Sequence, residues 1–296
     1  MGGQSAAPPR AKPAEQGRRV PNRAYFLFLI GIGLYRRYNI AGVPFRDMNR
    51  KIAILGTILF VGAFLALFFE EGYIRMNYPD KKKYPVRGID ISHHQESVDW
   101  RILSRADLDF AFIKATEGGD HKDTKFPYYW EETGKLGIAR GAYHYFTFCK
   151  TGREQALNYM DSVPDEEGTL PPIINLEYSG NCSARPGKEK IIEEIVEFSD
   201  LVMEKYGKRP IIYATNKSYR DFLAGELPEY RIWIRDIYWS PSLPDGREWS
   251  FWQYTDRGKL WGIEGFVDFN VYNGGREEFG ELLEKEPAAD YSRSGH

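Results

Sequence analysis

Residues that bind metal ions are scarce in this sequence, which has two cysteines and five histidines among 296 residues. His93 and His94 are adjacent, but no further His, Cys or Asp follows at the spacing of a metal site, so we predict neither a metal ion nor a cofactor. The segment KATEG at Lys114 lacks the glycine spacing and the Lys-Ser/Thr pair of a phosphate-binding loop. Lys114 is therefore expected to be a buried ion-pair partner.

A large excess of one charge is also missing, since the formal net charge is −2. The charge is nevertheless uneven. Residues 1–51 contain ten Lys and Arg against Glu15 and Asp47, which leaves the rest of the chain at −10. An acidic body argues against nucleic acid as its ligand, and the basic N-terminal part suits a membrane boundary.

A cleavable secretion signal is not recognisable, because no small-residue cleavage site follows the apolar segments. Instead, residues 52–69 form an apolar run of 18 residues without a charge. This length is enough to span a bilayer, and Arg50 and Lys51 directly before it predict a cytoplasmic N-terminus. The shorter apolar stretch 24–35 is expected to lie at the membrane interface.

This pattern divides the chain into five parts. We predict a basic, largely disordered cytoplasmic segment (1–51), a transmembrane anchor (52–69), a stalk (70–86), a catalytic barrel (87–285) and a disordered tail (286–296). The two cysteines, Cys149 and Cys182, lie in the exported part, where a disulfide and two free thiols are both compatible with the sequence.

The exported part alternates short β-rich runs with helical patterns. Residues 188–206 have the apolar periodicity of an amphipathic helix, and residues 127–136 and 151–160 are weaker helical candidates. The expected strands are 87–92, 110–116, 139–146, 172–177, 210–215, 231–237, 250–255 and 267–272. Alternation of this kind predicts parallel strands in a compact α/β barrel whose last three strands lack full helices.

Polar residues follow the apolar part of several expected strands, where βα barrels carry their functional groups. Asp90 ends the first strand and Asp268 lies in the last. Asn175 and Glu177 are two residues apart in the fourth strand and therefore share a face. The run PPII before them predicts a buried strand that delivers Glu177 to the rim, where burial can raise the pKa of its carboxyl group.

At these residues the chain resembles glycoside hydrolase family 25, the Chalaropsis-type lysozymes (N-acetylmuramidases), over about 190 residues. The resemblance rests on the order and spacing of several motifs. They are D-x-S-x-x-Q from Asp90, F-x-x-x-K-A-T-E-G from Phe110, G-x-Y-H-(Y/F) from Gly141, the strand end at Glu177, P-x-I-Y-x-T from Pro210, W-x-x-W-Q-Y from Trp249 and G-x-x-G-x-V-D-x-N from Gly262.

The resemblance implies a flattened TIM-like (β/α)5(β)3 barrel that hydrolyses the β-1,4 bond between N-acetylmuramic acid and N-acetylglucosamine in peptidoglycan. Glu177 would be the general acid/base, assisted by the acetamide of the substrate, with Asp90 and Asp268 shaping the subsite. The residues expected to contact the substrate are Tyr143, Tyr145, Tyr213, Trp233, Gln253, Tyr254 and Asn270.

One departure from the family pattern concerns catalysis. The family's D-x-E has Asn175 in its first position, which can still orient an acetamide but brings no negative charge. Arg235 also departs from the family, and it could reshape the cleft. We therefore expect a monomer, anchored in the cytoplasmic membrane, that cleaves peptidoglycan in the periplasm or outside the cell. The alternatives are a weakened glycan-binding scaffold and a hydrolase of another N-acetylhexosamine polymer.

Overall fold

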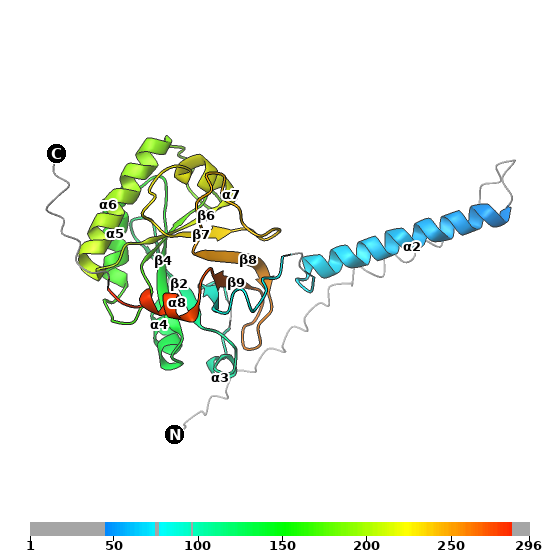
Figure 1. The fold of residues 1–296 in the computed structure, drawn as a ribbon, viewed down its shortest axis with the longest axis horizontal. Helices are drawn as coiled ribbons and strands as arrows, with labels where there is room; N and C mark the ends of the chain where they lie inside the picture. Colours follow the sequence, from blue (N-terminus) through cyan, green and yellow to red (C-terminus); the bar gives the residue numbers. More distant parts are fainter. Residues whose placement is uncertain (1–44, 75–76, 96, 286–296) are drawn as a thin grey trace, which may run out of the picture. The chain divides into compact units, whose positions relative to one another are not determined.

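The computed structural model describes residues 45–74, 77–95 and 97–285. Most of the predicted basic segment, the apolar stretch 24–35 and the tail 286–296 lie outside these residues. The chain divides into two units, residues 1–61 and residues 62–296. Each is described by itself below, and Figure 1 traces their elements.

Helix α2 (Phe45–Glu70) contains the apolar run predicted from the sequence. Its part Met48–Glu70, 23 residues, is long and apolar enough to cross a membrane, and none of it is buried inside the protein. Large apolar side chains such as Ile58 and Phe60 are 61% and 69% exposed. A helix that is apolar on all sides is typical of a segment buried in a protein core or in a membrane.

Eight strands of the second unit close into a barrel covered by helices, as the sequence predicted. In order around the barrel they are β1 (Arg87–Ile91), β2 (Phe110–Glu117), β4 (Ala139–Tyr145), β5 (Ile173–Leu176), β6 (Ile211–Thr215), β7 (Ile232–Arg235), β8 (Phe251–Gly258) and β9 (Val267–Tyr272), which pairs back to β1. The short strand β3 (His121–Lys122) pairs with the end of β2.

Helical segments occupy the connections from β1 to β7 (Figure 1). They are α3 (Trp100–Leu103), α4 (Phe126–Lys135), α5 (Gly152–Ser162), α6 (Lys188–Tyr206), α7 (Asn216–Ser218) and the π-helical turn η2 (Tyr219–Leu223). The connections from β7 to β8 and from β8 to β9 have none, and α8 (Arg276–Glu281) follows β9.

The barrel strands from β1 to β8 are parallel, as expected, but β9 is antiparallel to both of its neighbours. Its connection from β8, residues 259–266, is shorter than the dozen or more residues that a parallel crossover requires. The chain turns back at Gly262 and Gly265, whose φ angles of 97° and 86° suit glycine. This reversal brings Asp268 directly opposite Asp90 in the register of β9 and β1.

Helix α6 has the bounds that its apolar periodicity predicted. Ile191, Ile195, Phe198 and Val202 recur at helical spacing and are buried against the barrel. The helix ends at Gly207, whose φ of 66° is left-handed, as is common after the last turn of a helix. This helix and α5 together cover the strands that carry Glu177 and its neighbours.

The barrel interior is filled by aromatic rings in its lower part. Phe112 packs against Trp233 and Phe251 with ring centroids 4.5 and 5.1 Å apart, and Phe279 of α8 closes the bottom. Residues between the inward-facing ones, such as Ile113, pack instead against the helices. The polar residues at the other end of the barrel therefore lie next to a packed layer of apolar side chains.

Residues before β1 also pack on the barrel. The Asn77 side chain is buried and donates hydrogen bonds to the backbone oxygens of Tyr254 and Asp236, both at 3.1 Å. Tyr84 and Val86 are buried as well. Most of the predicted stalk is thus attached to the barrel surface, and Glu71 is also ion-paired with Lys259 of the connection after β8.

Candidate active site

Two facing aspartates form the centre of the site. Asp90 of β1 and Asp268 of β9 are register partners, and both contact the side chain of Gln253. Gln253 Nε2 donates to Asp90 Oδ2 at 2.9 Å and to Asp268 Oδ2 at 3.1 Å. Asn270 Nδ2 donates a third hydrogen bond, to Asp90 Oδ2 at 2.7 Å.

The amides that hold the aspartates are themselves held by aromatic residues. Tyr213 donates its hydroxyl hydrogen to Gln253 Oε1 at 2.9 Å, and Trp233 Nε1 donates to Asn270 Oδ1 at 2.8 Å. These hydrogen bonds orient both amides so that their N–H groups face the carboxylates. All four residues are at least 95% buried, so the network is preorganised inside the barrel.

Burial raises the pKa of both carboxyl groups of this pair. Desolvation raises the pKa of Asp268 well above the ordinary range, and the charge of Asp90 raises it further. A hydrogen bond between the two carboxyl groups lowers the pKa of Asp90 and raises that of Asp268 further. Because two like charges this close cannot both ionise easily, ionisation of one group disfavours ionisation of the other.

Asn175 and Glu177 lie on β5 and directly after it, on the side that faces the aspartates. Desolvation raises the pKa of Glu177, while a hydrogen bond from the Asn175 side chain and the charge of Arg235 oppose this rise. The carbonyl oxygen of Asn175, Oδ1, is buried and has no hydrogen-bond partner among the described residues. A buried unpaired acceptor of this kind costs about 1–3 kcal/mol and is uncommon in folded proteins.

Tyr143 and Tyr145 of β4 also belong to this end of the barrel. The pKa of Tyr143 is raised well above its ordinary value by burial and by the nearby charges of Asp90 and Asp268. The hydroxyl of Tyr145 donates to the backbone oxygen of Ser179, just beyond Glu177. Both rings therefore line the space beside the carboxyl groups.

The ammonium group of Lys114 is within 5.1 Å of the Tyr145 ring centre. It also forms an ion pair with Glu117 at 2.7 Å, so the predicted role of Lys114 is confirmed. Lys114 is buried, and its charge is therefore compensated inside the protein rather than offered to a ligand.

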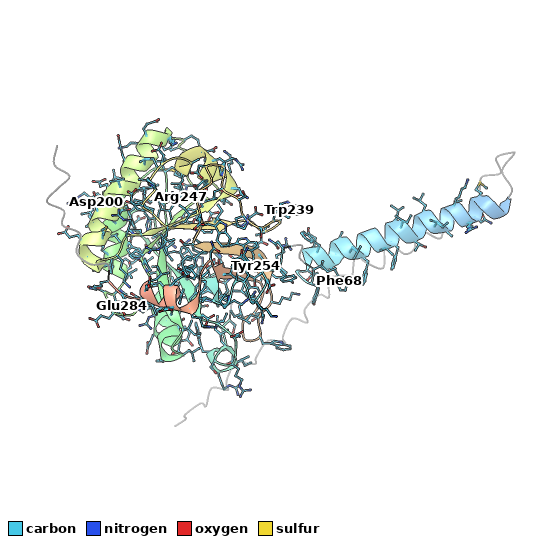
Figure 2. The ribbon with its side chains drawn as sticks, in the orientation of Figure 1. Phe68, Asp200, Trp239, Arg247, Tyr254 and Glu284 are labelled. Atoms are coloured by element: carbon cyan, nitrogen blue, oxygen red, sulfur yellow. A yellow bond between two sulfur atoms is a disulfide. The ribbon has the colours of Figure 1, made fainter. Side chains whose placement is uncertain are left out.

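Tyr254 is the one predicted contact residue that the fold does not bring to this network. Adjacent residues of a strand point to opposite sides, so Tyr254 of β8 faces away from Gln253. Tyr254 is labelled in Figure 2. Its ring packs against Trp252, and its hydroxyl is hydrogen-bonded to Arg87 at the start of β1. Tyr254 thus supports the outside of β8 under the segment that contains Asn77.

His144 is likewise turned away from the site. Its ring nitrogens contact Thr116 Oγ1 at 2.7 Å and Gln155 Oε1 at 3.1 Å behind the barrel wall. Burial lowers its pKa to about 4, so the ring is neutral at physiological pH. His144 is therefore a structural residue.

Arg235 joins the site at the end of β7, and its proximity to Glu177 was not evident from the sequence. Its Nη2 donates to Asp256 Oδ2 at 2.9 Å, and its charge acts on Glu177, Asp90 and Asp268. The signal in the sequence is its position two residues after Trp233, which assigns both side chains to the same face.

Two further features bear on the chemistry. Within the described residues, no group of three or more His, Cys, Asp or Glu side chains is arranged to hold a metal ion.

Cys149 and Cys182, whose pairing the sequence left open, are joined by a disulfide that links the loops after β4 and β5. This bond restrains the segment that follows Glu177.

The site thus contains Glu177, a half-buried carboxylic acid of raised pKa, and a separate pair of carboxyl groups, Asp90 and Asp268, whose pKa values are also raised. Carboxylic acids that hold their protons more tightly than usual suit general-acid chemistry on a neutral, hydroxyl-rich ligand. The aromatic rings and amides around it suit the faces and hydroxyl groups of a sugar.

Residues 89–263 match the profile of glycosyl hydrolases family 25. The chain is 38% identical to Escherichia coli YegX over 200 residues, covering 66% of this chain and 72% of that protein. It is 30% identical to lysozyme M1 of Streptomyces globisporus over 205 residues, covering 64% and 68%.

Solved structures extend the similarity to the fold. A family 25 glycosyl hydrolase from Bacillus anthracis superimposes with a TM-score of 0.66 at 37% identity, covering 70% of this chain and 97% of that one. A bacterial lysozyme from Streptomyces coelicolor gives a TM-score of 0.61 at 28% identity, covering 67% and 96%. The profile match includes Asp90, Asn175 and Glu177, while Asp268 and Asn270 lie beyond it.

Proposed function

Because the chain belongs to glycosyl hydrolases family 25, and is therefore a glycoside hydrolase, we propose that it cleaves peptidoglycan between N-acetylmuramic acid and N-acetylglucosamine. The observation that carries this proposal is the pairing of Glu177, a carboxyl group of raised pKa, with Asn175, which has a buried acceptor without a partner. Relatives named lysozyme and N,O-diacetylmuramidase support the choice of substrate.

In the proposed mechanism Glu177 is the general acid and then the general base. Its raised pKa favours the protonated form, which can give its proton to the glycosidic oxygen as the C1–O bond breaks. The ionised carboxylate then takes a proton from the water that completes hydrolysis. One side chain thus serves both steps.

Asn175 is proposed to position the acetamide of the muramic acid. Its N–H group is already engaged with Glu177, whereas its carbonyl oxygen can accept the acetamide N–H. Held in this way, the acetamide oxygen attacks C1 from the face opposite the leaving group and forms an oxazolinium ion, a route used by substrate-assisted glycosidases. Asn175 adds no negative charge to stabilise that cation.

The carboxyl pair is proposed to supply the missing charge. In this proposal the pair, whose pKa values are raised by burial, holds one proton between its two groups and keeps one negative charge close to the sugar. A preorganised charge of this kind is typically worth about 10²–10³ in rate. The surrounding side chains proposed to contact the glycan are Tyr143, Tyr145, Tyr213, Trp233, Gln253 and Asn270.

The fold proposal is a TIM-like barrel of five strand–helix units followed by three strands. The helical segments between β1 and β7, and their lack in the two later connections between barrel strands, support this count. Active sites of such barrels lie at the C-terminal ends of the strands, where Glu177 and Arg235 are found.

We also propose that α2 anchors the enzyme, as a monomer, in the cytoplasmic membrane with the barrel exported. The length and composition of Met48–Glu70 support the span, and Arg50 and Lys51 support a cytoplasmic N-terminus. The few residues between the end of α2 and the barrel would limit the enzyme to glycan near the membrane.

The test is to identify which sugar carries the new reducing end after cleavage. Full-length protein in detergent micelles is incubated with purified peptidoglycan, and the products are reduced with borohydride. Muramitol is expected, because the bond broken lies on the C1 side of muramic acid. Glucosaminitol would contradict the proposal, as would cleavage of a chitin oligomer but not of peptidoglycan. Binding without cleavage would favour a glycan-binding scaffold.

A further inference from the structure

We propose that Arg235 binds an acidic substituent of the glycan, foremost the free lactyl carboxylate of a muramic acid that has lost its stem peptide. The enzyme would then prefer peptide-free strands. This inference rests on the proposed function, because it requires muramic acid to bind beside Glu177. It goes beyond the proposed function because it states which form of the glycan the enzyme prefers.

The strand register places Arg235 at the mouth of the barrel. Asn175, Tyr213 and Trp233 are partners across β5, β6 and β7. Arg235 follows Trp233 by two residues, as Glu177 follows Asn175, so both belong to the next row toward the mouth. Two strand spacings separate them, about 10 Å, and a long arginine side chain spans much of that distance.

The guanidinium group has donors left for a ligand. Arginine has five N–H donors, and among the described residues the hydrogen bond found for Arg235 is that from Nη2 to Asp256 Oδ2 at 2.9 Å. Its side chain is 31% exposed, so the other donors are open to solvent in the cleft. The planar fork of arginine matches a carboxylate or a phosphate.

The ion pair with Asp256 does not by itself account for this arrangement. Both side chains are about one third exposed, and pairs of this kind typically stabilise a fold by about 0–1 kcal/mol. The pair does fix the guanidinium in place, since one edge is held by Asp256. A fixed guanidinium with an open edge is preorganised for an anion.

The charges around Arg235 would tolerate an anion. Burial raises the pKa values of Asp90, Asp268 and Glu177, which favours their neutral forms, and Asn175 carries no charge. The negative charge that remains on the Asp90–Asp268 pair lies on β1 and β9, whereas Arg235 places a positive charge that acts on Glu177 at the end of β7.

Muramic acid carries a lactyl carboxylate only when no stem peptide is attached. When a stem peptide is attached, the lactyl carbonyl is an uncharged amide, whereas removal of the peptide leaves a carboxylate. A phosphodiester on a sugar hydroxyl group would offer the same chemistry from another source. Glycans with and without each group therefore distinguish the two sources.

The experiment compares full-length protein in micelles on two substrates that differ in one charge. These are peptide-free glycan strands and the same strands with their lactyl carboxylates converted to methylamides. For the wild type, the charge-assisted hydrogen bonds predict a KM about 10- to 100-fold lower on the acidic strands. In Arg235→Gln this ratio should fall to about 1, and Arg235→Lys should restore part of it. Arg257→Gln, which removes a cation from β8 outside the cleft, should keep the wild-type ratio.

Several results would overturn the inference. They are equal KM values for both strands in the wild type, or a preference that survives in Arg235→Gln. A preference that is seen only on phosphodiester-bearing strands and is lost after hydrofluoric acid treatment would overturn the carboxylate and assign the phosphate. Failure of the underlying function looks different, since no strand would then release reducing ends, or Glu177→Gln would remain active.

Discussion

Replacing Asn175 by Asp puts a second carboxyl group two residues before Glu177 on the same face of β5. The change removes the hydrogen bond that the Asn175 amide donates to Glu177, which at present lowers the pKa of that acid. It also adds a like charge. Both effects act in the same direction and raise the pKa of Glu177.

The size of the effect follows from Coulomb's law. Same-face residues two apart on a strand are about 7 Å apart, and at an effective dielectric constant of about 20 two unit charges then repel by about 2.4 kcal/mol. This corresponds to between about 1 and 2 pH units for the second ionisation of the pair. Loss of the amide hydrogen bond adds to it.

The assay is the pH dependence of kcat on purified peptidoglycan. Glu177 must be protonated to act as the acid, so activity falls as pH rises through its pKa, and Asn175→Asp should move that alkaline limb upward. At the optimum the variant should be as fast as the wild type or faster, because its carboxylate can stabilise the oxazolinium ion. Asn273→Asp makes the same substitution at an exposed residue and should leave the profile unchanged.

The reasoning would be refuted by an alkaline limb that stays in place or moves to lower pH in Asn175→Asp. Either result would mean that the alkaline limb does not report the ionisation of Glu177. A slower variant whose limb moved upward would retain the acid but contradict the role given to charge at residue 175.

The remaining predictions concern stability. Because the pKa of Asp268 is raised in the folded state, stability is lost as pH rises above the ordinary value for an aspartate; Asp268→Asn should therefore be more stable than the wild type at pH 7, by on the order of 1 kcal/mol, and not at pH 4. Thermal melts at the two pH values test this, and an equal difference at both would contradict it. Reduction of Cys149–Cys182, which closes a loop with a sequence separation of 33, should cost about 3–4 kcal/mol, measured as a fall in Tm beside the oxidised protein. Trp233→Phe leaves Asn270 Oδ1 without its donor and should cost about 1–3 kcal/mol in denaturant unfolding; an unchanged midpoint would show that another group replaces the indole.

The sequence predicted the parts of the fold that depend on local periodicity. The eight barrel strands and α6 follow from alternating or helical apolar patterns, and the shared face of Asn175 and Glu177 follows from the strand period alone. The comparisons confirm the family assignment made from the order of the motifs.

Features set by tertiary structure were less accessible. The antiparallel direction of β9, which pairs Asp268 with Asp90, depends on how a loop turns back. Tyr254 directly follows Gln253 in the motif W-x-x-W-Q-Y, yet its side chain faces the opposite side of β8. The nearness of Arg235 to Glu177 depends on a register across three strands, which no local pattern contains. The assignment of individual catalytic roles stays a prediction.

The most direct test of the account is the activity of Glu177→Gln on purified peptidoglycan. The glutamine keeps the size of the side chain but has no proton to give, so release of muramic acid reducing ends should fall by at least about 10²-fold with an unchanged Tm. Glu166→Gln, the same substitution at a residue paired with Arg140 near the other end of the barrel, should retain wild-type activity. Full activity in a folded Glu177→Gln would contradict the account, because another group would then have to be the acid.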